Sequence, residues 1–565
     1  MTRWFASAVR ALPVALSLLA TTTVTLAQTR ADNRLNTMFT EAGRSQAMLR
    51  MLLRQLPKGA DLHNHGSGGI FVEDILAMAA AKDGCLLLAT MTLAAPPCID
   101  GTSVPVRGLE TRDVTLYNHA IDGMSTRGQK LNVREPTESG HERFFRSFGR
   151  FGFGTSGENA RVLAISLEQA GYDNNHYLEL MMGPSVTTDL NALYVKEAWN
   201  EADMQGRFDR LVPQLNAVLA DASAATDRML QGAAAINNCD SMTPGVGCDV
   251  TLRLLMTVSR EASPEQVFGR MAWSFAVVNA DPRFVGVNIA QPEDGPVSLR
   301  DYSLHMRMFA FFKQHYPQVK LTLHAGELAL GLTPPRDLRF HIREAVEVAG
   351  ALRIGHGVDI AHEDGATELL ARMAREHIAV EINLTSNDVI LGVLGAEHPL
   401  TLYRAAGVPV ALSTDDSGVS RNDLTNEYLR AVTEHGLQYT DLRQISRDSL
   451  TYSFIEGESL WDASGMQLTD ICKGLPKKPS PACTTLLTTS AKAKEQWRLE
   501  QAFAGFEAQL PKLLQAIPPA GFSCVPATQK QQAAEGKEKG KTLLPSPSAT
   551  ASISGLQSKQ IKNSC

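Results

Sequence analysis

Short apolar runs alternate along the chain with stretches in which apolar residues recur at helical spacing. Eight of the runs have the length and aliphatic character of buried strands. They are Ala60–Leu62, Tyr177–Met181, Thr251–Val258, Phe284–Ile289, Val319–Leu323, Leu352–Ile354, Ala379–Ile382 and Val408–Leu412. Helical patterns separate most of them, for example Arg336–Ala349 and Gly365–Glu376. Strands that alternate with helices form parallel sheets, so eight such units predict an α/β fold of the closed (β/α)₈ barrel type.

The first residues have the composition of a secretory signal peptide. Two arginines precede a mostly apolar run from Ala11 to Leu26, and small residues at its end suit cleavage. Residues 1–27 are therefore predicted to be removed, which implies a periplasmic or secreted protein. An uncleaved membrane anchor is the alternative, but the run is polar in its middle and shorter than a usual membrane span.

The rest of the chain divides by pattern into a lead-in, a barrel and a tail. A helical lead-in over residues 28–56 precedes the barrel domain of residues 57–525. Two stretches, near residues 66–133 and 231–249, are longer than a barrel requires and are predicted to be loop insertions. Residues 526–565 are rich in Gln, Lys, Ser and Gly, which predicts a disordered tail.

Six of the eight cysteines fall into three close pairs, each flanked by Gly, Pro, Asp or Ser. The pairs are Cys85 with Cys98, Cys239 with Cys248 and Cys472 with Cys483. In an exported protein, such pairs predict local disulfides that close short loops. A zinc ribbon is excluded because the sequence contains no Cys-x-x-Cys.

Charge and hydropathy narrow the class of partner. The formal net charge is −6 and no strongly basic run precedes the C-terminal tail, so we expect no nucleic acid partner. Hydrophobic content of 44% and charged content of 20% are ordinary for a globular protein. No later segment has the length and apolar character of a membrane span, so we expect no membrane association after signal cleavage.

Polar clusters follow the predicted strands, at the end where barrels of this type carry their active sites. The clusters are His63-Asn64-His65, His324-Ala325-Gly326-Glu327, Gly355-His356-Gly357, Ser386-Asn387 and Asp415-Asp416. A barrel brings strand ends that are distant in the sequence to one mouth. We therefore expect these clusters to meet there.

Four of these residues predict a metal site. His63 and His65 point to the same side of a strand, because side chains alternate with a period of two. Alone, this pair is equally typical of two surface histidines. His324 and Asp415, also at strand ends, favour a metal, since three imidazoles and one carboxylate suit Zn²⁺ and leave a position for water. We predict one zinc ion per chain, which would make water nucleophilic near neutral pH.

Three further residues are candidates for proton transfer and substrate binding. Glu327 follows His324 by three residues and could exchange a proton with substrate, although an exposed carboxylate that caps a helix is the plainer interpretation. His356 lies between two glycines and could orient the nucleophile and help remove its proton, although a single histidine is more often structural. Asp416 directly follows Asp415, and two adjacent acids are costly unless each has a separate task. One is expected to bind metal and the other to accept a hydrogen bond from substrate.

At these positions the sequence resembles the adenosine deaminases of the metal-dependent amidohydrolase superfamily, including their secreted, growth-factor-like branch. The matching stretches are Pro57–His65, Leu323–Glu327, Arg353–Gly357, Thr385–Asn387, Leu412–Asp416 and Glu427–Tyr428. The resemblance runs from about Pro57 to Phe454 and implies a (β/α)₈ barrel with zinc on His63, His65, His324 and Asp415. It also implies that Glu327 protonates the purine N1, that His356 assists the nucleophile and that Asp416 hydrogen-bonds the purine ring.

The sequence departs from the family pattern in the substrate pocket and keeps the pattern at the metal. Gly66-Ser67 replaces the Leu-Asp that many members carry after the second histidine. The purine-contacting glycine is missing from residues 290–294. Ser67, Gln291 and Glu293 are therefore predicted as specificity contacts.

The resemblance implies hydrolytic deamination of adenosine, and of 2′-deoxyadenosine, to inosine and ammonia outside the cytoplasm. The main alternative is a deaminase for adenine or an N⁶-substituted adenine or adenosine on the same zinc site. A growth-factor-like binding protein with residual activity is a second alternative, which the retention of all predicted metal and proton-transfer residues disfavours. A cytidine-deaminase type of zinc site is excluded because its His-x-Glu with Pro-Cys-x-x-Cys is absent. The oligomeric state stays open, with a homodimer among the options.

Overall fold

The computed structural model describes residues 32–127, 138–462 and 467–515, and the structural statements below concern these residues. The chain divides after Leu510 into two compact units. The first unit holds every element discussed here except the end of helix α22. The predicted signal peptide and the predicted tail lie outside the described residues.

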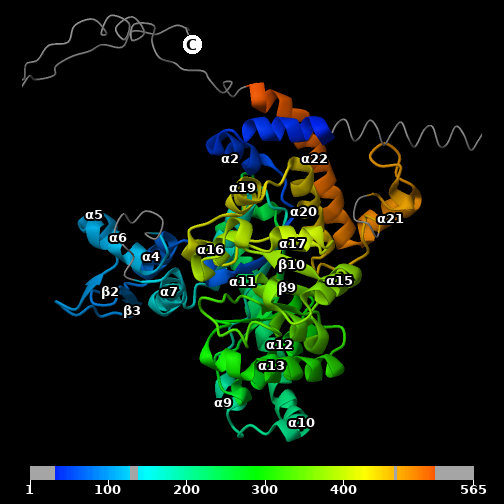
Figure 1. Ribbon diagram of the computed structural model, residues 1–565. Helices are drawn as coiled ribbons and strands as arrows, with labels where there is room; N and C mark the ends of the chain where they lie inside the picture. The colour runs from blue at the N-terminus through cyan, green and yellow to red at the C-terminus, as the bar shows by residue number, and fades with distance from the viewer. Residues whose placement is uncertain (1–31, 128–137, 463–466, 516–565) are drawn as a thin grey trace, which may run out of the picture. The chain divides into compact units, whose positions relative to one another are not determined.

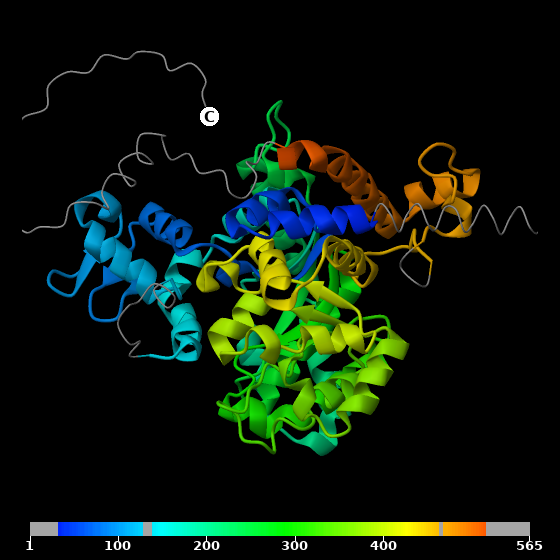
Figure 2. The same cartoon turned by 45° about the horizontal axis from the view of Figure 1, so that its top comes forward.

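Eight parallel strands lie at the centre of the first unit and are surrounded by helices (Figures 1 and 2). One sheet has the order β1 Ala60–His65, β5 Tyr177–Met181, β6 Thr251–Ser259 and β7 Phe284–Ala290. The other sheet consists, in order, of β8 Thr322–Ala325, β9 Arg353–His356, β10 Ala379–Ile382 and β11 Val410–Leu412. Parallel bridges from Val287 to Leu321 and from Asn64 to Asp415 join the two sheets at both edges. The strands therefore close, and the predicted (β/α)₈ barrel is confirmed.

All eight predicted strands are present, with small changes at their ends. β5 and β10 have the predicted bounds, whereas β8 begins at Thr322 and continues to Ala325. β1 and β9 extend beyond the predicted runs to His65 and His356. Because the polar residues continue these strands, the backbone of the barrel itself sets the direction of several site side chains.

The helices of the barrel and its connections bury apolar faces against the strands. For example, α15 turns Leu369, Leu370 and Met373 inward and its polar side outward. The helices are α7 Gly140–Thr155, α8 Asn159–Tyr172, α9 Leu190–Tyr194, α10 Met204–Asn216, α11 Leu219–Ile236, α12 Pro264–Ala280, α13 Pro296–His315, α14 His341–Glu344, α15 Ala366–Glu376, α16 Leu384–Leu391, α17 Leu400–Ala405, α18 Ser417–Ser420, α19 Leu424–His435, α20 Tyr439–Thr451, α21 Pro481–Thr489 and α22 Ala491–Gln515.

One predicted helix begins later than its pattern suggested. Residues 336–340 form turns, and helical structure starts with α14 and continues as the π-helix η3 Ala345–Ala349. The Glu363 carboxylate accepts hydrogen bonds from the backbone N–H groups of Ile342 and Arg343. This cap satisfies the first free amides and fixes the start of the helix there.

The expected insertion near residues 66–133 has a small core of its own. It contains the short helix α3 Gly66–Gly69, helices α4 Val72–Ala81, α5 Leu109–Arg112 and α6 Val114–Gly123, and strands β2 Cys85–Leu87, β3 Thr92–Ala94 and β4 Ser103–Pro105. The three strands form an antiparallel sheet in the order β3-β2-β4. Buried apolar residues such as Ile75, Leu86 and Phe151 pack between this sheet and helices α4 and α7. The stretch is thus a folded lobe and not only a loop.

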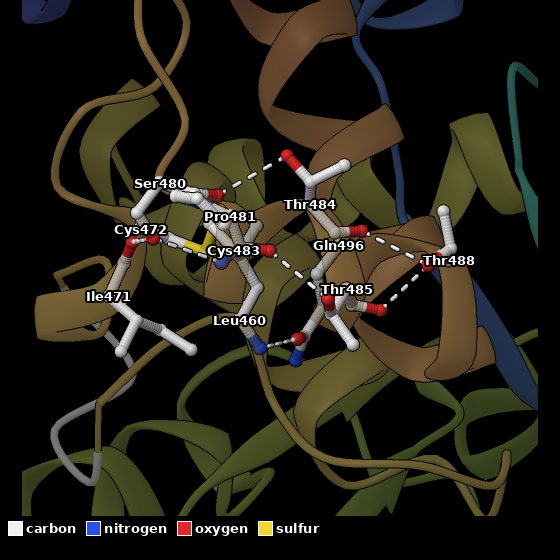
Figure 3. The surroundings of a disulfide bond; sticks show 10 residues. All are labelled: Leu460, Ile471, Cys472, Ser480, Pro481, Cys483, Thr484, Thr485, Thr488 and Gln496. Carbon is white, nitrogen blue, oxygen red and sulfur yellow. Dashed lines mark hydrogen bonds between the residues drawn. A yellow bond between two sulfur atoms is a disulfide. The ribbon is translucent and has the colours of Figure 1, made fainter.

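All three predicted disulfides are present: Cys85–Cys98, Cys239–Cys248 and Cys472–Cys483. Figure 3 shows Cys472–Cys483 beside the start of α21, where the Ser480 hydroxyl accepts a hydrogen bond from the Cys483 backbone N–H at 3.0 Å. This disulfide belongs to a small apolar cluster with Leu460 and Ala493. No helix in the described part of the chain combines the length and apolar character that a membrane span requires.

A buried lysine joins the lead-in to the barrel. Residues 32–42 and α2 Gln46–Gln55 are helical, as predicted for the lead-in. The fully buried Lys58 donates hydrogen bonds to the backbone oxygens of Leu53 (2.7 Å), Leu56 (3.2 Å) and Asp173 (2.6 Å). The ammonium thereby adds a donor to the Leu53 carbonyl, which also accepts from the Leu56 backbone N–H at 3.2 Å, and it satisfies the carbonyls of Leu56 and Asp173.

We predict that Lys58→Met lowers the free energy of unfolding by about 3 kcal/mol, because three buried carbonyl groups lose their donor. Lys82→Met is the matched control, because Lys82 also donates to three backbone oxygens, those of Phe153, Gly154 and Ser156, but is partly exposed. Water can replace its ammonium, so the expected loss is about 1 kcal/mol or less. Urea unfolding followed by circular dichroism measures both, and equal losses would contradict the role of burial.

Candidate metal centre and active site

Four predicted ligands meet at the mouth of the barrel: His63 and His65 on β1, His324 on β8 and Asp415 after β11. The Nε2 atom of His324 lies 3.1 Å from that of His63 and 3.3 Å from that of His65. Asp415 Oδ1 lies 3.6 Å from His63 Nε2 and 3.2 Å from His65 Nε2. A tetrahedron with ligand distances of about 2.1 Å has edges of about 3.4 Å. These four separations lie near this value and all six are within 4.8 Å, so the four atoms can bind one metal ion together.

Hydrogen bonds behind the ligands determine which ring nitrogens face the site. His63 Nδ1 lies 2.7 Å from a carboxylate oxygen of Glu381, and His324 Nδ1 lies 2.8 Å from the amide oxygen of Asn288. Both partners are acceptors, so each Nδ1 carries a hydrogen and each Nε2 turns a lone pair toward the other. Two lone pairs 3.1 Å apart repel one another unless a proton or a metal ion lies between them. The donor set thus fits a metal ion.

The protonation of the ligands agrees with this arrangement. Burial and the neighbouring imidazoles hold the pKa of His324 well below its usual value, which keeps the ring neutral as a ligand must be. Burial also disfavours a charge on His63, but hydrogen bonds to Asp415 and Glu381 outweigh it and raise its pKa to about 10. In the metal-free protein a proton takes this position, and a metal ion has to displace it.

Backbone hydrogen bonds and a serine hold Asp415 in place. Its backbone N–H donates to the carbonyl oxygen of His63 at 2.8 Å, and its φ of +57° lies in the left-handed region. A non-glycine residue adopts this conformation at an energetic cost, which is common at functional sites. The Ser386 hydroxyl donates to Asp415 Oδ2 at 2.5 Å, so Oδ1 remains for the metal.

Glu327 lies in the loop after β8 and is buried, which contradicts the interpretation as an exposed capping carboxylate. Its Oε1 lies 3.6 Å from His356 Nδ1, and His324, Glu327 and His356 form a second close group. Burial and the nearby Asp415 carboxylate raise the pKa of Glu327 well above its usual value. The raised pKa favours the protonated carboxyl, which is the form that can give a proton.

Glu293 was predicted to contact substrate, but its position does not support that contact, because it is not among the residues that line the cavity described below. Its carboxylate is fully buried and accepts hydrogen bonds from the backbone N–H groups of Gly326 and Glu327, both at 2.9 Å. It also lies 2.6 Å from His341 Nδ1. Both oxygens are used to hold the loop that carries Glu327, so Glu293 positions that loop instead of binding substrate.

A cavity of about 320 Å³ opens beside the predicted ligands. Its walls are formed by His65, Phe144, Phe145, Phe148, Ala290, Gln291, Pro292, His324, Glu327, Asp415 and Asp416. The three phenylalanines come from α7, which the sequence analysis did not connect with the site. Among the described lining residues there is no lysine or arginine. The cavity therefore combines an apolar wall with a polar floor.

Of the other predicted substrate contacts, Gln291 and Asp416 line the cavity and Ser67 does not. Gln291 lines the cavity with a φ of +86°. Asp416 also lines it, and its Oδ1 is buried without a hydrogen-bond partner in the described structure. A Cβ on Gly68 would lie only 1.6 Å from this oxygen, so α3 leaves room for Asp416 by carrying a glycine there. Ser67, the neighbour of Gly68, is exposed and is not among the lining residues, so its position does not support the predicted contact.

Sequence analysis missed the partners behind the ligands. Glu381 and Asn288 lie inside predicted strands, and both side chains are completely buried. A carboxylate within the apolar run of β10 is costly unless it is paired. That cost was the available signal for Glu381, whereas nothing in the sequence distinguishes Asn288.

Comparison with known proteins identifies similar sequences. A family model described as adenosine deaminase matches residues 158–460, more than half of the 565 residues. Adenosine deaminases of Shewanella loihica and Mycobacterium ulcerans are 34% identical over 152 residues and 31% identical over 221 residues. These matches cover 26% and 37% of this chain and 43% and 56% of the relatives. The chain thus spans about half the length of the curated relatives that it matches.

Solved structures with a similar fold have lower identity. An adenine deaminase from Arthrobacter aurescens has 17% identity and a TM-score of 0.43, over 71% of this chain and 94% of that chain. An Arabidopsis N⁶-mAMP deaminase has 20% identity and a TM-score of 0.46, over 72% of this chain and 95% of that chain.

The hydrogen bond from His324 to Asn288 yields a test of the metal site. Asn288→Leu keeps the volume but removes the acceptor, so we expect the affinity for a divalent ion to fall about 10- to 100-fold, the usual effect of losing such a partner. Asn288→Asp retains an acceptor and is the matched control, with affinity close to that of the unaltered protein. Competition with a chromophoric chelator, with Zn²⁺ as the probe ion, measures both. Unchanged affinity in a folded Asn288→Leu protein would contradict the assignment.

Proposed function

The chain belongs to the adenosine deaminase family, and we propose that it converts adenosine, and 2′-deoxyadenosine, to the 6-oxopurine nucleoside and ammonia by hydrolysis. One observation carries the proposal. The four clustered ligands, the buried Glu327 carboxyl with its raised pKa and the unpartnered Asp416 oxygen border the same cavity or lie directly beside it. A metal-activated water and a proton donor must act on one ring for this reaction.

Zinc is the proposed metal, with one ion per chain. Three imidazole nitrogens and one carboxylate oxygen within 4.8 Å of one another support this choice over magnesium or calcium, which prefer oxygen ligands. Bound zinc would supply a Lewis acid that makes water nucleophilic near neutral pH. Asp415 and the three histidines hold the ion, and Glu381 and Asn288 orient two of those histidines.

The chain's own residues then direct the reaction at the purine ring. Addition of water at C6 removes the aromaticity of the six-membered ring, and Glu327 gives its proton to N1 as that bond forms. Of the two protons of the water, one restores Glu327 and the other passes to the departing amino group. Burial raises the pKa of Asp416 to about 7, and the protonated form donates a hydrogen bond from its free Oδ1 to a purine ring nitrogen, which is an acceptor. Departure of ammonia restores the conjugated ring. The phenylalanines of α7 cover the faces of the ring and exclude bulk water.

The cavity also bears on the substrate class. A phosphate group would normally be bound by an arginine or lysine, and neither is among the described lining residues. This supports an uncharged nucleoside over a nucleotide. A second candidate, an adenosine with an apolar N⁶ substituent, is favoured by the aromatic wall of Phe144, Phe145 and Phe148.

We further propose that the enzyme works in the periplasm or outside the cell. The three disulfides support this, since such bonds persist in oxidising compartments. The pattern of residues 1–27 supports it independently.

Glu327→Gln removes the proposed proton donor and retains the side-chain volume. We expect kcat to fall about 10²-fold or more, the usual scale for loss of a general acid, with metal content unchanged. Glu363→Gln is the control, because Glu363 is also buried but caps α14 away from the cavity. The loss of ultraviolet absorbance measures the rate. A Glu327→Gln enzyme within a few-fold of the unaltered rate would remove Glu327 from the mechanism.

A substrate panel tests the proposed specificity. We expect kcat/KM to be highest for adenosine and 2′-deoxyadenosine and lowest for AMP, because no cation is available for the phosphate. Chelation should abolish activity, and added zinc should restore it. Faster turnover of adenine or N⁶-methyladenosine than of adenosine would favour the alternative substrates. Activity that survives complete removal of the metal would contradict the proposed chemistry.

A further inference from the structure

Two residues without an assigned role connect His356 to a backbone amide of the barrel. The backbone N–H of Leu400 donates to His398 Nδ1 at 3.2 Å. His398 Nε2 lies 3.0 Å from the Asn387 amide oxygen, and the Asn387 amide nitrogen lies 2.9 Å from His356 Nδ1. All three side chains are buried, so water does not compete for these hydrogen bonds.

The direction of every hydrogen bond in this chain follows from its first member. A backbone amide can only donate, so Nδ1 of His398 is an acceptor. In a neutral imidazole the other nitrogen then carries the hydrogen, so His398 Nε2 donates to the Asn387 oxygen. The Asn387 nitrogen must therefore donate to His356 Nδ1. It follows that the hydrogen of a neutral His356 resides on Nε2.

The state of His398 agrees with this assignment. Burial, together with the nearby His435 and Arg430, lowers the pKa of His398 to about 3, so the ring is neutral. Asn383 approaches the His356 ring with its amide nitrogen, at 3.4 Å from Nδ1 and 3.5 Å from Nε2. Because these two distances are nearly equal, Asn383 does not distinguish the two ring nitrogens, and the assignment depends on Asn387.

The helix that carries Asn387 is itself anchored. Glu427 on α19 accepts hydrogen bonds from the backbone N–H groups of Leu384 (2.6 Å) and Thr385 (3.1 Å), at the first turn of α16. Neighbouring residues of the same helix then serve two site groups. Ser386 donates to Asp415, and Asn387 donates to His356.

We propose that His398 and Asn387 are positioning residues that hold His356 as an Nε2–H donor. With Nδ1 engaged by Asn387 and a hydrogen on Nε2, the neutral ring has no free lone pair. His356 then stabilises the oxygen that adds to C6 by donating a hydrogen bond to it. The removal of a proton from the nucleophile, which the position of His356 in the sequence suggested for this residue, falls instead to the Glu327 carboxylate once it has given its own proton to N1. This inference rests on the proposed function. It adds to it the hydrogen bonds that place the hydrogen of His356 on Nε2.

The matched variants are His398→Phe and His398→Gln. Phenylalanine cannot donate to Asn387, so the Asn387 amide is free to rotate and kcat should fall about 10-fold or more with KM within two-fold. Glutamine retains a donor at the end of its side chain, so it should recover most of the rate. A purely structural role for His398 would not give this rescue together with an unchanged KM.

Asn387→Asp tests the tautomer directly with a side chain of the same shape. A carboxylate accepts from His356 Nδ1, which would move the hydrogen from Nε2 to Nδ1. We expect a loss in kcat of about 10²-fold or more, since a wrong histidine tautomer is costly in catalysis.

Nitrogen-15 shifts of labelled histidine in the metal-loaded enzyme provide a readout that does not depend on activity. The His356 signals, identified by their loss in His356→Ala, should show an unprotonated Nδ1 and a protonated Nε2, and Asn387→Asp should reverse them. A protonated Nδ1 in the unaltered enzyme, or equal rates for His398→Phe and His398→Gln, would overturn the proposal. Lack of turnover of every purine would instead refute the proposed function, while the nitrogen shifts would still decide the tautomer.

Discussion

The hydrogen bond from the Asp415 backbone N–H to the His63 carbonyl oxygen joins the first and last strands of the barrel, and the site depends on it. Without this closure, ligands separated by hundreds of residues would not share one ion. Side chains reinforce the seam, because Asp61 accepts hydrogen bonds from the Thr414 hydroxyl at 2.6 Å and from the Thr414 backbone N–H at 3.4 Å. The same contacts that close the fold therefore set the distances between the proposed metal ligands.

A second constraint lies beneath His63. The fully buried Arg353 forms ion pairs with Glu381 and Glu179, both at 2.5 Å, and its guanidinium lies over the Phe454 ring. Removing three charged groups from water is costly, and hydrophobic residues of similar size would often give equal stability. The network is better explained by its effect on the orientation of His63. Arg353 keeps Glu381 ionised, and ionised Glu381 holds the Nδ1 hydrogen of His63 so that Nε2 faces the site.

The sequence allowed the barrel and its ligands to be predicted because both have local signals. Strands buried on both faces are continuous apolar runs, and histidines and acids at the ends of such runs stand out. The substrate side has no such signal. Phe144, Phe145 and Phe148 have the spacing of an ordinary apolar helix face, and only their packing shows that α7 borders the cavity. Glu293 was assigned to substrate because it lies in the right loop, but sequence does not reveal that its carboxylate turns away to cap the loop of Glu327.

The three carboxyl groups of the cavity illustrate how one environment supports different tasks. Burial alone would raise the pKa of all three, yet hydrogen bonds from His63 and His65 hold Asp415 well below its usual value. Glu327 has no such partner and is raised well above its usual value by burial and by Asp415, while Asp416 lies between them at about 7. Asp415 is thus an anion suited to a cation, and Glu327 is an acid suited to a ring nitrogen. The negative charge of Asp415 adds to the effect of burial and favours the protonated form of Glu327, so the two carboxyl groups take different charge states in one cavity.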